Sequence, residues 1–313
     1  MSSRRAIAFC CDEGYAPFAL MAACQIAARS SGRDFDILLC GGPAPEVPDT
    51  LAGIGVRRVS VATGGAFAGL RLDARRTESA YLRLALPEAL GAEYDRLLYL
   101  DSDVVVQGGD WGALLGADLG GFAVGAVRDN VQWRTPGRVP EQFRRFGWPA
   151  APYFNSGLLL IDLPAFRAQD LMARAVALGR AEKDRLIGHD QTLLNCLLRG
   201  AWAELSPVWN WQLTWASQLF EAAEEAHLVH FIGPVKPWRD EGGRLPPRFA
   251  RATAEFLATH FPDRPRPAPR PGPARRPGEM RRLLWRHWRA AGRMAAYLNR
   301  FPTNLTVRAP AGR

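Results

Sequence analysis

Two carboxylates directly follow a hydrophobic run near the middle of the chain. The run covers residues 97–100, and Asp101 and Asp103 come after it with Ser102 between them. Acids this close together repel one another and lose solvation unless a cation joins them. Carboxylate oxygens suit hard ions such as Mg²⁺ or Mn²⁺, and such an ion can hold a pyrophosphate. The motif therefore predicts either a divalent metal site or two solvated acids.

A histidine and a lysine form a second group, in the segment His230-Phe-Ile-Gly233-Pro-Val-Lys236-Pro-Trp238. An imidazole can ligate a metal, and an ammonium can neutralise phosphate oxygens that the metal does not reach. Gly233 permits a close approach to the backbone. The alternative is that His230 is an ordinary core or surface histidine.

Two further motifs place amides and acids where a cleft could use them. Asn155-Ser-Gly157 precedes an apolar run, and its polar groups could face a cleft or cap a loop. Asp190 and Gln191 open a predicted helix, where a negative group is favoured by the helix N-terminus, so an ordinary N-cap is the alternative.

The elements that position these motifs alternate along the chain. Strands are predicted over residues 4–11, 35–40, 95–100, 121–127, 157–161 and 228–231. Helices are predicted over residues 16–29, 78–90, 164–182, 188–199 and 248–259, and a loop over residues 130–152. This alternation predicts an α/β fold in which helices cover a central sheet.

The composition excludes several classes of protein. With 313 residues, 48% of them apolar, the chain can bury one large core or two modest ones, which rules out global disorder. No apolar run reaches the roughly 18–20 residues that span a bilayer, and the run after Arg5 is too short for a secretory signal. The five cysteines form no CxxC pair, which fits a reducing cytoplasm. We therefore expect a cytoplasmic protein.

The positive charge is concentrated at the C-terminal end. The whole chain carries +9, whereas residues 264–313 hold 13 arginines and one acid, Glu279. We predict a main domain over residues 1–262, a Pro/Arg-rich linker over 263–278 and a basic tail over 279–313.

A basic amphipathic helix is predicted over residues 279–300 of that tail. One sector is apolar and is formed by Met280, Leu284, Trp288, Ala291, Ala295 and Leu298. The opposite side carries Arg282, Arg286, Arg289, Arg293 and Arg300. We expect this helix to bind an anionic membrane surface, with no nucleic-acid partner. The alternatives are that it packs back on the domain or binds another anionic polymer.

In their order and spacing, the four motifs resemble the retaining glycosyltransferases of the family-8 type, which include bacterial lipooligosaccharide galactosyltransferases and the glycogenins. The resemblance covers roughly residues 5–240, and its motifs are Asp101-Ser-Asp103, Asn155-Ser-Gly157, Asp190-Gln191 and His230…Gly233…Lys236-Pro-Trp. It implies the GT-A fold, in which a mixed central sheet binds a nucleotide-sugar.

The resemblance also implies a role for each site residue. A divalent ion, Mn²⁺ or Mg²⁺, would be held by Asp101, Asp103 and His230. The nucleotide of a UDP-sugar would be bound by Asp12, Tyr15, Asp101, Ser102, Asp103, Gly233 and Lys236. The transferred sugar would be bound by Arg83, Asp129, Asn155, Asp190 and Gln191. Gly14 and Ala85 stand where relatives often carry polar or basic side chains.

The resemblance implies transfer of a hexose from a UDP-sugar, UDP-galactose or UDP-glucose, to a glycan hydroxyl with retention. Gln191 would stabilise the cationic sugar through its amide oxygen, and a covalent intermediate on Asp190 is the alternative. The basic helix suggests a lipopolysaccharide core or another lipid-linked glycan as acceptor, at the inner face of the cytoplasmic membrane. Deletion of residues 264–313 is then expected to spare donor hydrolysis. A haloacid-dehalogenase-like phosphatase and a non-catalytic membrane adaptor are the competing functions.

Overall fold

The computed structural model describes residues 4–71, 81–267 and 276–310. The middle of the predicted linker, residues 268–275, and the first three residues of the helix predicted over 78–90 therefore lie outside the described residues.

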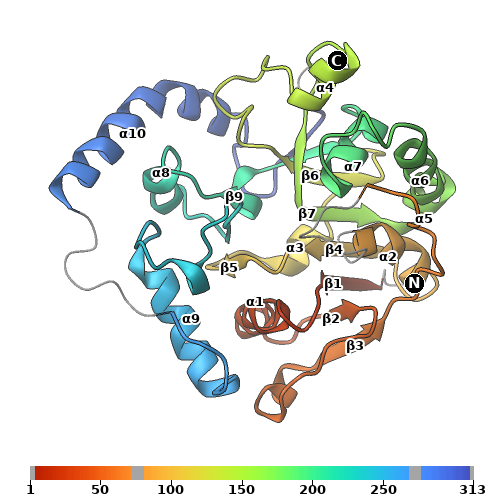
Figure 1. The fold of residues 1–313 in the computed structure, drawn as a ribbon, viewed down its shortest axis with the longest axis horizontal. Helices are drawn as coiled ribbons and strands as arrows, with labels where there is room; N and C mark the ends of the chain where they lie inside the picture. The colour runs from red at the N-terminus through yellow and green to blue at the C-terminus, as the bar shows by residue number, and fades with distance from the viewer. Residues whose placement is uncertain (1–3, 72–80, 268–275, 311–313) are drawn as a thin grey trace.

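The centre of the molecule is an eight-stranded mixed sheet (Figure 1), in the order β3-β2-β1-β4-β7-β6-β8-β11. The strands β3, β2, β1 and β4 run parallel, whereas β7 is antiparallel to both of its neighbours. The strands are β1 (Arg5–Cys10), β2 (Phe35–Gly41), β3 (Val56–Ser60), β4 (Arg96–Leu100), β6 (Val124–Arg128), β7 (Phe154–Asp162), β8 (Ala203–Leu205) and β11 (Val307–Arg308).

A second, three-stranded sheet lies beyond the end of β4. It consists of β5 (Val104–Val106), β9 (Trp211–Gln212) and β10 (Leu228–His230). In the antiparallel pair of β5 and β10, Val104 lies opposite His230. The small sheet therefore brings His230 next to the Asp-Ser-Asp turn that joins β4 to β5.

Helices cover both faces of the main sheet because the strands are apolar on both sides. Ile7 and Phe9 share one core with α1 (Ala16–Arg29), α3 (Trp111–Leu115), α9 (Pro247–His260) and α10 (Pro277–Leu298). Ala6 and Ala8 share the other with α2 (Leu82–Leu90), α5 (Leu163–Ala168), α6 (Leu171–Ala181) and α7 (Asp190–Leu198). This double coverage explains why buried strands such as β4 appear as continuous apolar runs. Of the shorter helices, α4 (Glu141–Phe146) touches the second core and α8 (Gln218–Ala223) the first. The described residues also include the 3-10 turns η1 (Asp49–Ile54), η3 (Pro207–Asn210) and η4 (Pro237–Arg239).

The predicted α/β fold is confirmed, with three local corrections. The helix predicted over 164–182 is two helices, because Asp170 has a left-handed φ of 49° between them. The predicted loop 130–152 contains α4. The strand predicted over 157–161 begins earlier, at Phe154, so Asn155 and Ser156 belong to β7 and not to a loop.

The C-terminal segment adds to the main body at two points. The strand β11 pairs with β8 and extends the sheet, and the helix α10 packs on the first core. The predicted helix is confirmed, but the apolar sector predicted from its sequence is not the buried one. The side chains that α10 buries are Leu283, Ala290, Met294 and Tyr297, and the ring of Tyr297 stacks on Trp133.

The predicted apolar sector instead remains on the surface in the first half of α10. Met280, Leu284 and Trp288 are exposed there, Trp288 to 74%, together with the neighbouring Trp285. Figure 1 shows this half, in blue, at the periphery of the molecule. Across the described ranges, no helix combines the length and the hydropathy needed to cross a bilayer.

Candidate active site

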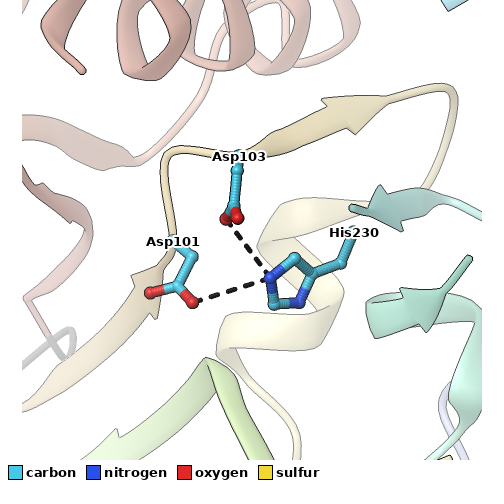
Figure 2. A group of neighbouring side chains, drawn as sticks. All are labelled: Asp101, Asp103 and His230. Atoms are coloured by element: carbon cyan, nitrogen blue, oxygen red, sulfur yellow. Dashed lines mark ion pairs between the residues drawn. The ribbon is translucent and has the colours of Figure 1, made fainter. Parts of the chain in front are cut away.

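The two acids after β4 and the histidine at the end of β10 converge on one point (Figure 2). The Nε2 atom of His230 lies 3.2 Å from Oδ1 of Asp103 and 3.6 Å from Oδ2 of Asp101. One ligand atom from each side chain lies within 4.8 Å of the others. Two carboxylate oxygens and one imidazole nitrogen form a donor set suited to Mn²⁺ or Mg²⁺. These are the three residues that the resemblance implies as metal ligands.

The ring nitrogen of His230 that faces away from the two acids contacts Asn210, the last residue of η3. This Nδ1 atom lies 2.9 Å from Oδ1 of Asn210. Gly157 leaves space for the ring, because a Cβ at that position would lie 2.2 Å from Cε1 of His230. The glycine of the Asn-Ser-Gly motif is therefore required by the histidine of another motif.

Lys236 closes the outer side of this cluster. Its Nζ atom contacts a carboxylate oxygen of Asp103 and the carbonyl oxygen of Phe231. Burial alone would raise the pKa of Asp103, but Lys236 and His230, when its ring is protonated, outweigh it, so that the pKa then lies well below its ordinary value. The segment that carries Lys236 is fixed by Trp238, which stacks on Phe18 of α1 with ring centroids 3.5 Å apart.

Arg83 of α2 links the cluster of Asp101, Asp103 and His230 to the start of α7. Its guanidinium lies 3.0 Å from a carboxylate oxygen of Asp101 and 3.0 Å from one of Asp190. It also donates to the carbonyl oxygen of Ser156 and lies over the ring of Tyr99. Burial alone would lower the pKa of Arg83, but Asp101 and Asp190 raise it by more than burial lowers it. The guanidinium therefore stays charged.

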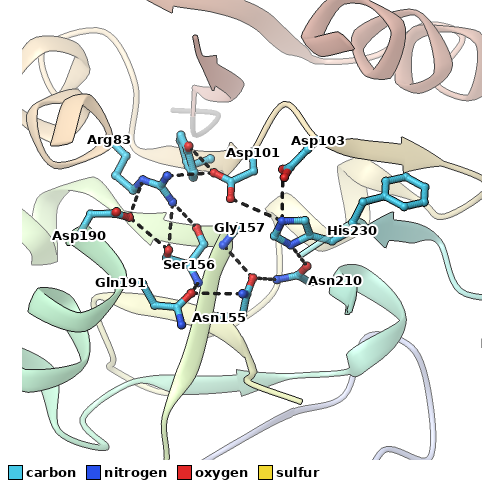
Figure 3. Close-up of polar contacts among 12 residues, drawn as sticks. Arg83, Asp101, Asp103, Asn155, Ser156, Gly157, Asp190, Gln191, Asn210 and His230 are labelled. Carbon is cyan, nitrogen blue, oxygen red and sulfur yellow. Dashed lines mark hydrogen bonds and ion pairs between the residues drawn. The ribbon is translucent and has the colours of Figure 1, made fainter. Parts of the chain in front are cut away.

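Four of the predicted sugar-binding residues lie close together in Figure 3, namely Arg83, Asn155, Asp190 and Gln191. The fifth, Asp129, follows β6 and contacts Gln191. The Oε1 atom of Gln191 accepts from Nδ2 of Asn155 at 3.1 Å, and its Nε2 atom donates to Asp129 at 3.3 Å. Burial raises the pKa of Asp129, although hydrogen bonds from Val131 and Gln191 oppose it. A β-bulge between Ala126 and Val127 shifts the register just before Asp129. The bulge changes how this end of β6 faces β7.

The predicted nucleotide-binding residues lie at the ends of β1, β4 and β10. Asp12 follows β1, and its Oδ1 atom accepts the backbone N–H of Tyr15 at 3.1 Å. The ring of Tyr15 meets Trp238 edge-on, with centroids 5.9 Å apart, so segments more than 200 residues apart form one rim. Ser102 is buried, and the space beside Gly233 is open. A side chain at Gly14 would crowd Asp12, with its Cβ 3.1 Å from Oδ1.

The match to a known family covers the whole of this arrangement. The model of "Glycosyl transferase family 8" matches residues 6–242, which include every predicted site residue. The chain belongs to glycosyl transferase family 8. This membership sets aside the phosphatase and the adaptor as alternatives.

Individual curated proteins resemble the chain over shorter stretches. "General stress protein A" of Bacillus subtilis is 32% identical over 177 residues, which are 52% of this chain and 59% of that protein. "Lipopolysaccharide 1,2-glucosyltransferase" of Escherichia coli is 31% identical over 171 residues, 50% of this chain and 48% of that protein. The chain thus spans about half the length of these curated relatives.

A solved structure shows the GT-A fold over most of the chain. The galactosyltransferase LgtC, in complex with donor and acceptor sugar analogs, has a TM-score of 0.65 and 25% identity. The match covers 80% of this chain and 95% of that one. The predicted GT-A fold is confirmed.

Sequence reasoning missed one polar residue in this family 8 site. Asn210 is fully buried and contacts both His230 and Asn155. It lies between two tryptophans in a segment without a recognisable motif. Only the pairing of β9 with β10 brings it to His230.

Proposed function

We propose that this family 8 protein is a retaining hexosyltransferase that moves a hexose from a UDP-sugar to a hydroxyl of a glycan acceptor. The observation that carries the proposal is the convergence of Asp101, Asp103 and His230, with Lys236 beside them. The donor would be UDP-glucose or UDP-galactose. This choice is supported by the names of the glucosyltransferase relative and of the galactosyltransferase LgtC.

The residues present fit a divalent ion by charge as well as by geometry. The candidate site gathers four carboxylates, from Asp101, Asp103, Asp129 and Asp190, and two cations, Arg83 and Lys236. Nδ1 of His230 is engaged by Asn210, which leaves Nε2 as the ligand atom. A bound Mn²⁺ or Mg²⁺ would stabilise negative charge on the diphosphate. Lys236 and the open backbone at Gly233 would bind the remaining phosphate oxygens, while Asp12, Tyr15 and Ser102 would bind the rest of the nucleotide.

Arg83, Asp129, Asn155, Asp190 and Gln191 would orient the transferred sugar. Oδ2 of Asp190 is already held by Arg83 and by the hydroxyl of Ser156 at 3.2 Å. With a covalent intermediate on Asp190 as the alternative, we place Gln191 at the reacting carbon. Its amide oxygen would stabilise positive charge on the sugar.

The bond changes would take place on one face of the sugar. The bond from the anomeric carbon to the phosphate oxygen breaks, and the acceptor oxygen bonds to the same face. The acceptor proton passes to a phosphate oxygen of the departing UDP. Lys236 would stabilise the charge that develops on this leaving group.

A UDP-release assay tests this function. It would compare a panel of UDP-sugars, with Mn²⁺ and with a chelator, for the wild-type chain and Asp103→Asn. We expect metal-dependent turnover of one donor and a loss of more than about 100-fold in the variant, because a ligand charge and the partner of Lys236 are removed. Thermal unfolding would show that the variant is folded. Turnover of no donor, together with no binding of UDP, would refute the proposal.

The first half of α10 would bring the enzyme to an anionic membrane at its cytoplasmic side, where a lipopolysaccharide core or another lipid-linked glycan is the acceptor. Trp285 and Trp288 are 53% and 74% exposed, and Arg289 lies over the ring of Trp285. Exposed tryptophans among arginines suit the headgroup region of anionic lipids.

Point substitutions test the membrane proposal better than removal of the tail. Deleting residues 264–313 would uncover the core around Met294 and Tyr297, so the structure argues against the expectation that this deletion spares donor hydrolysis. The double change Trp285→Ala and Trp288→Ala should reduce sedimentation with anionic liposomes about tenfold and leave UDP release unchanged. Leu305→Ala, at another exposed apolar side chain, is the control. Undiminished sedimentation of the double variant would exclude this surface.

A further inference from the structure

A continuous chain of hydrogen bonds connects the metal-binding histidine to the sugar-binding residues (Figure 3). From His230 it passes to Asn210 at 2.9 Å, and from Asn210 to Oδ1 of Asn155 at 2.9 Å. It continues from Asn155 to Gln191 at 3.1 Å and ends at Asp129, 3.3 Å further on. Its five side chains come from five different segments of the chain.

Two backbone N–H groups of β7 determine which atom donates and which accepts along this series of hydrogen bonds. The N–H of Gly157 donates to Oδ1 of Asn155 at 3.0 Å, and the N–H of Ser156 donates to Oε1 of Gln191 at 3.1 Å. A backbone N–H can only donate, so the side-chain atom that faces it must be the amide oxygen. The backbone alone therefore fixes which end of each amide is the oxygen and which is the nitrogen.

This orientation determines the next two links. Because Asn155 presents its oxygen, Asn210 must approach it with its NH₂ group. The amide oxygen of Asn210 is then the atom that faces His230, and an amide oxygen can only accept. The ring proton of His230 therefore belongs on Nδ1.

The position of that proton decides whether His230 can act as a ligand. A neutral ring with its proton on Nδ1 has its lone pair on Nε2, the atom that faces Asp101 and Asp103. With Asn210 reversed, its NH₂ group would face Nδ1 and the proton would move to Nε2. The ring would then donate toward the carboxylates and could not ligate an ion between them.

We propose that Asn210 is a positioning residue that holds His230 in its metal-binding tautomer and aligns it with the amides of the sugar site. The inference rests on the proposed metal-dependent function. The backbone of β7 is the common origin of both alignments: one N–H sets Asn155, Asn210 and His230, and its neighbour sets Gln191. The same two residues of β7 thus orient side chains in both the proposed metal site and the proposed sugar site.

Three variants of the full-length chain test this role. Asn210→Leu removes the acceptor for Nδ1–H at similar volume. Asn210→Asp keeps an acceptor for Nδ1–H but loses the NH₂ group that donates to Asn155, so it is the conservative variant for the tautomer of His230 alone. Gln25→Glu is the matched control, an amide-to-acid change on α1 that keeps its bond from the backbone of Val106. Thermal unfolding of each variant would establish that it is folded.

The first readout is the location of the His230 ring proton, measured by ¹⁵N NMR without metal at a pH where the ring is neutral. The second is the affinity for Mn²⁺ in the presence of UDP. We expect the proton on Nδ1 in the wild type, in Asn210→Asp and in the control. Asn210→Leu should lose this preference and bind Mn²⁺ roughly 10- to 100-fold more weakly, the usual effect of removing a partner that orients a metal ligand. Asn210→Asp should stay within about threefold of the wild type.

Two results would overturn the inference. One is a wild-type ring with its proton on Nε2, and the other is a folded Asn210→Leu variant with the wild-type affinity for Mn²⁺. A different outcome concerns the proposed function. If the ring proton behaves as expected but wild-type protein binds no Mn²⁺ with UDP, the metal-dependent function fails while the tautomer assignment stands.

Discussion

Two clusters of buried charge lie close together in this protein and are built in opposite ways. Around Glu204 of β8, one carboxylate is surrounded by Arg128 at 2.6 and 2.8 Å, Arg300 at 2.7 Å and the hydroxyl of Tyr297 at 3.3 Å. Its side chain is 0% exposed and that of Arg128 is 1% exposed. Every charge in this cluster has partners within the protein.

The cluster in the candidate active site is incomplete by comparison. Asp101 and Asp103 share one imidazole nitrogen, and their side chains retain 23% and 16% exposure. Carboxylates outnumber cations there, whereas guanidinium groups outnumber the carboxylate around Glu204. The comparison teaches that burial and charge alone do not mark a functional site. An excess of carboxylates with residual exposure does mark the candidate site. The fully buried cluster around Glu204 instead fastens β8 and α10 to β6.

The largest effect is expected when the saturated cluster loses its carboxylate. Glu204→Gln keeps the shape but leaves the guanidinium of Arg128 buried without a counter-charge. We expect a loss of about 3–5 kcal/mol in the free energy of unfolding, measured in urea. UDP release per folded molecule should change less than fivefold. A variant as stable as the wild type would break the comparison, because the cluster would then not be structural.

Removing the outer arginine of the same cluster should cost less. Arg300→Met leaves the bidentate pair of Glu204 and Arg128 in place but removes a charged hydrogen bond, worth about 1.5–3 kcal/mol of unfolding free energy. The matched control is Arg289→Met on the exposed side of α10, which we expect to change stability by less than about 0.5 kcal/mol. Equal effects of the two changes would show that α10 is not fastened through Glu204.

A change in the active-site cluster should act on binding more than on folding. Gly157→Ala places a methyl group where the ring of His230 lies, so the ring must move away from the carboxylates. We expect the affinity for Mn²⁺ with UDP to fall roughly 10- to 100-fold, measured by titration. Gly137→Ala is the control, since open space surrounds its Cβ position. Unchanged metal affinity in Gly157→Ala would separate His230 from the metal site.

The acid dependence of stability should sharpen the comparison further. Burial raises the pKa of Glu204, but Arg128 and Arg300 outweigh it, so the pKa in the folded protein lies below its ordinary value. Its contribution is therefore fully present above the ordinary value of about 4.3 and is lost as the pH falls below it. Between about pH 4 and pH 3, the unfolding free energy of the wild type should fall more steeply than that of Glu204→Gln, by up to about 1.4 kcal/mol per pH unit. Parallel slopes would mean that Glu204 does not titrate in this way.

The sequence by itself determined the elements with strong local signals. The apolar runs of β1, β2 and β4 and the periodicity of α1 predict their positions closely, since each signal lies within the element. The order of the motifs also predicted that Asp101, Asp103 and His230 belong to one site, and the structure brings their side chains together.

The short strands and the orientation of α10 were decided only by tertiary structure. Strands such as β9 and β11 have two residues each, too few for any periodicity, and exist because a neighbouring strand pairs with them. In α10 the sequence offers two apolar sides, and contact of Tyr297 with Trp133 selects the one that is buried. Asn210 has no local signal at all. Its role follows from a hydrogen-bond direction that the backbone N–H of Gly157 in β7 imposes through Asn155. Such a constraint exists only once the chain has folded.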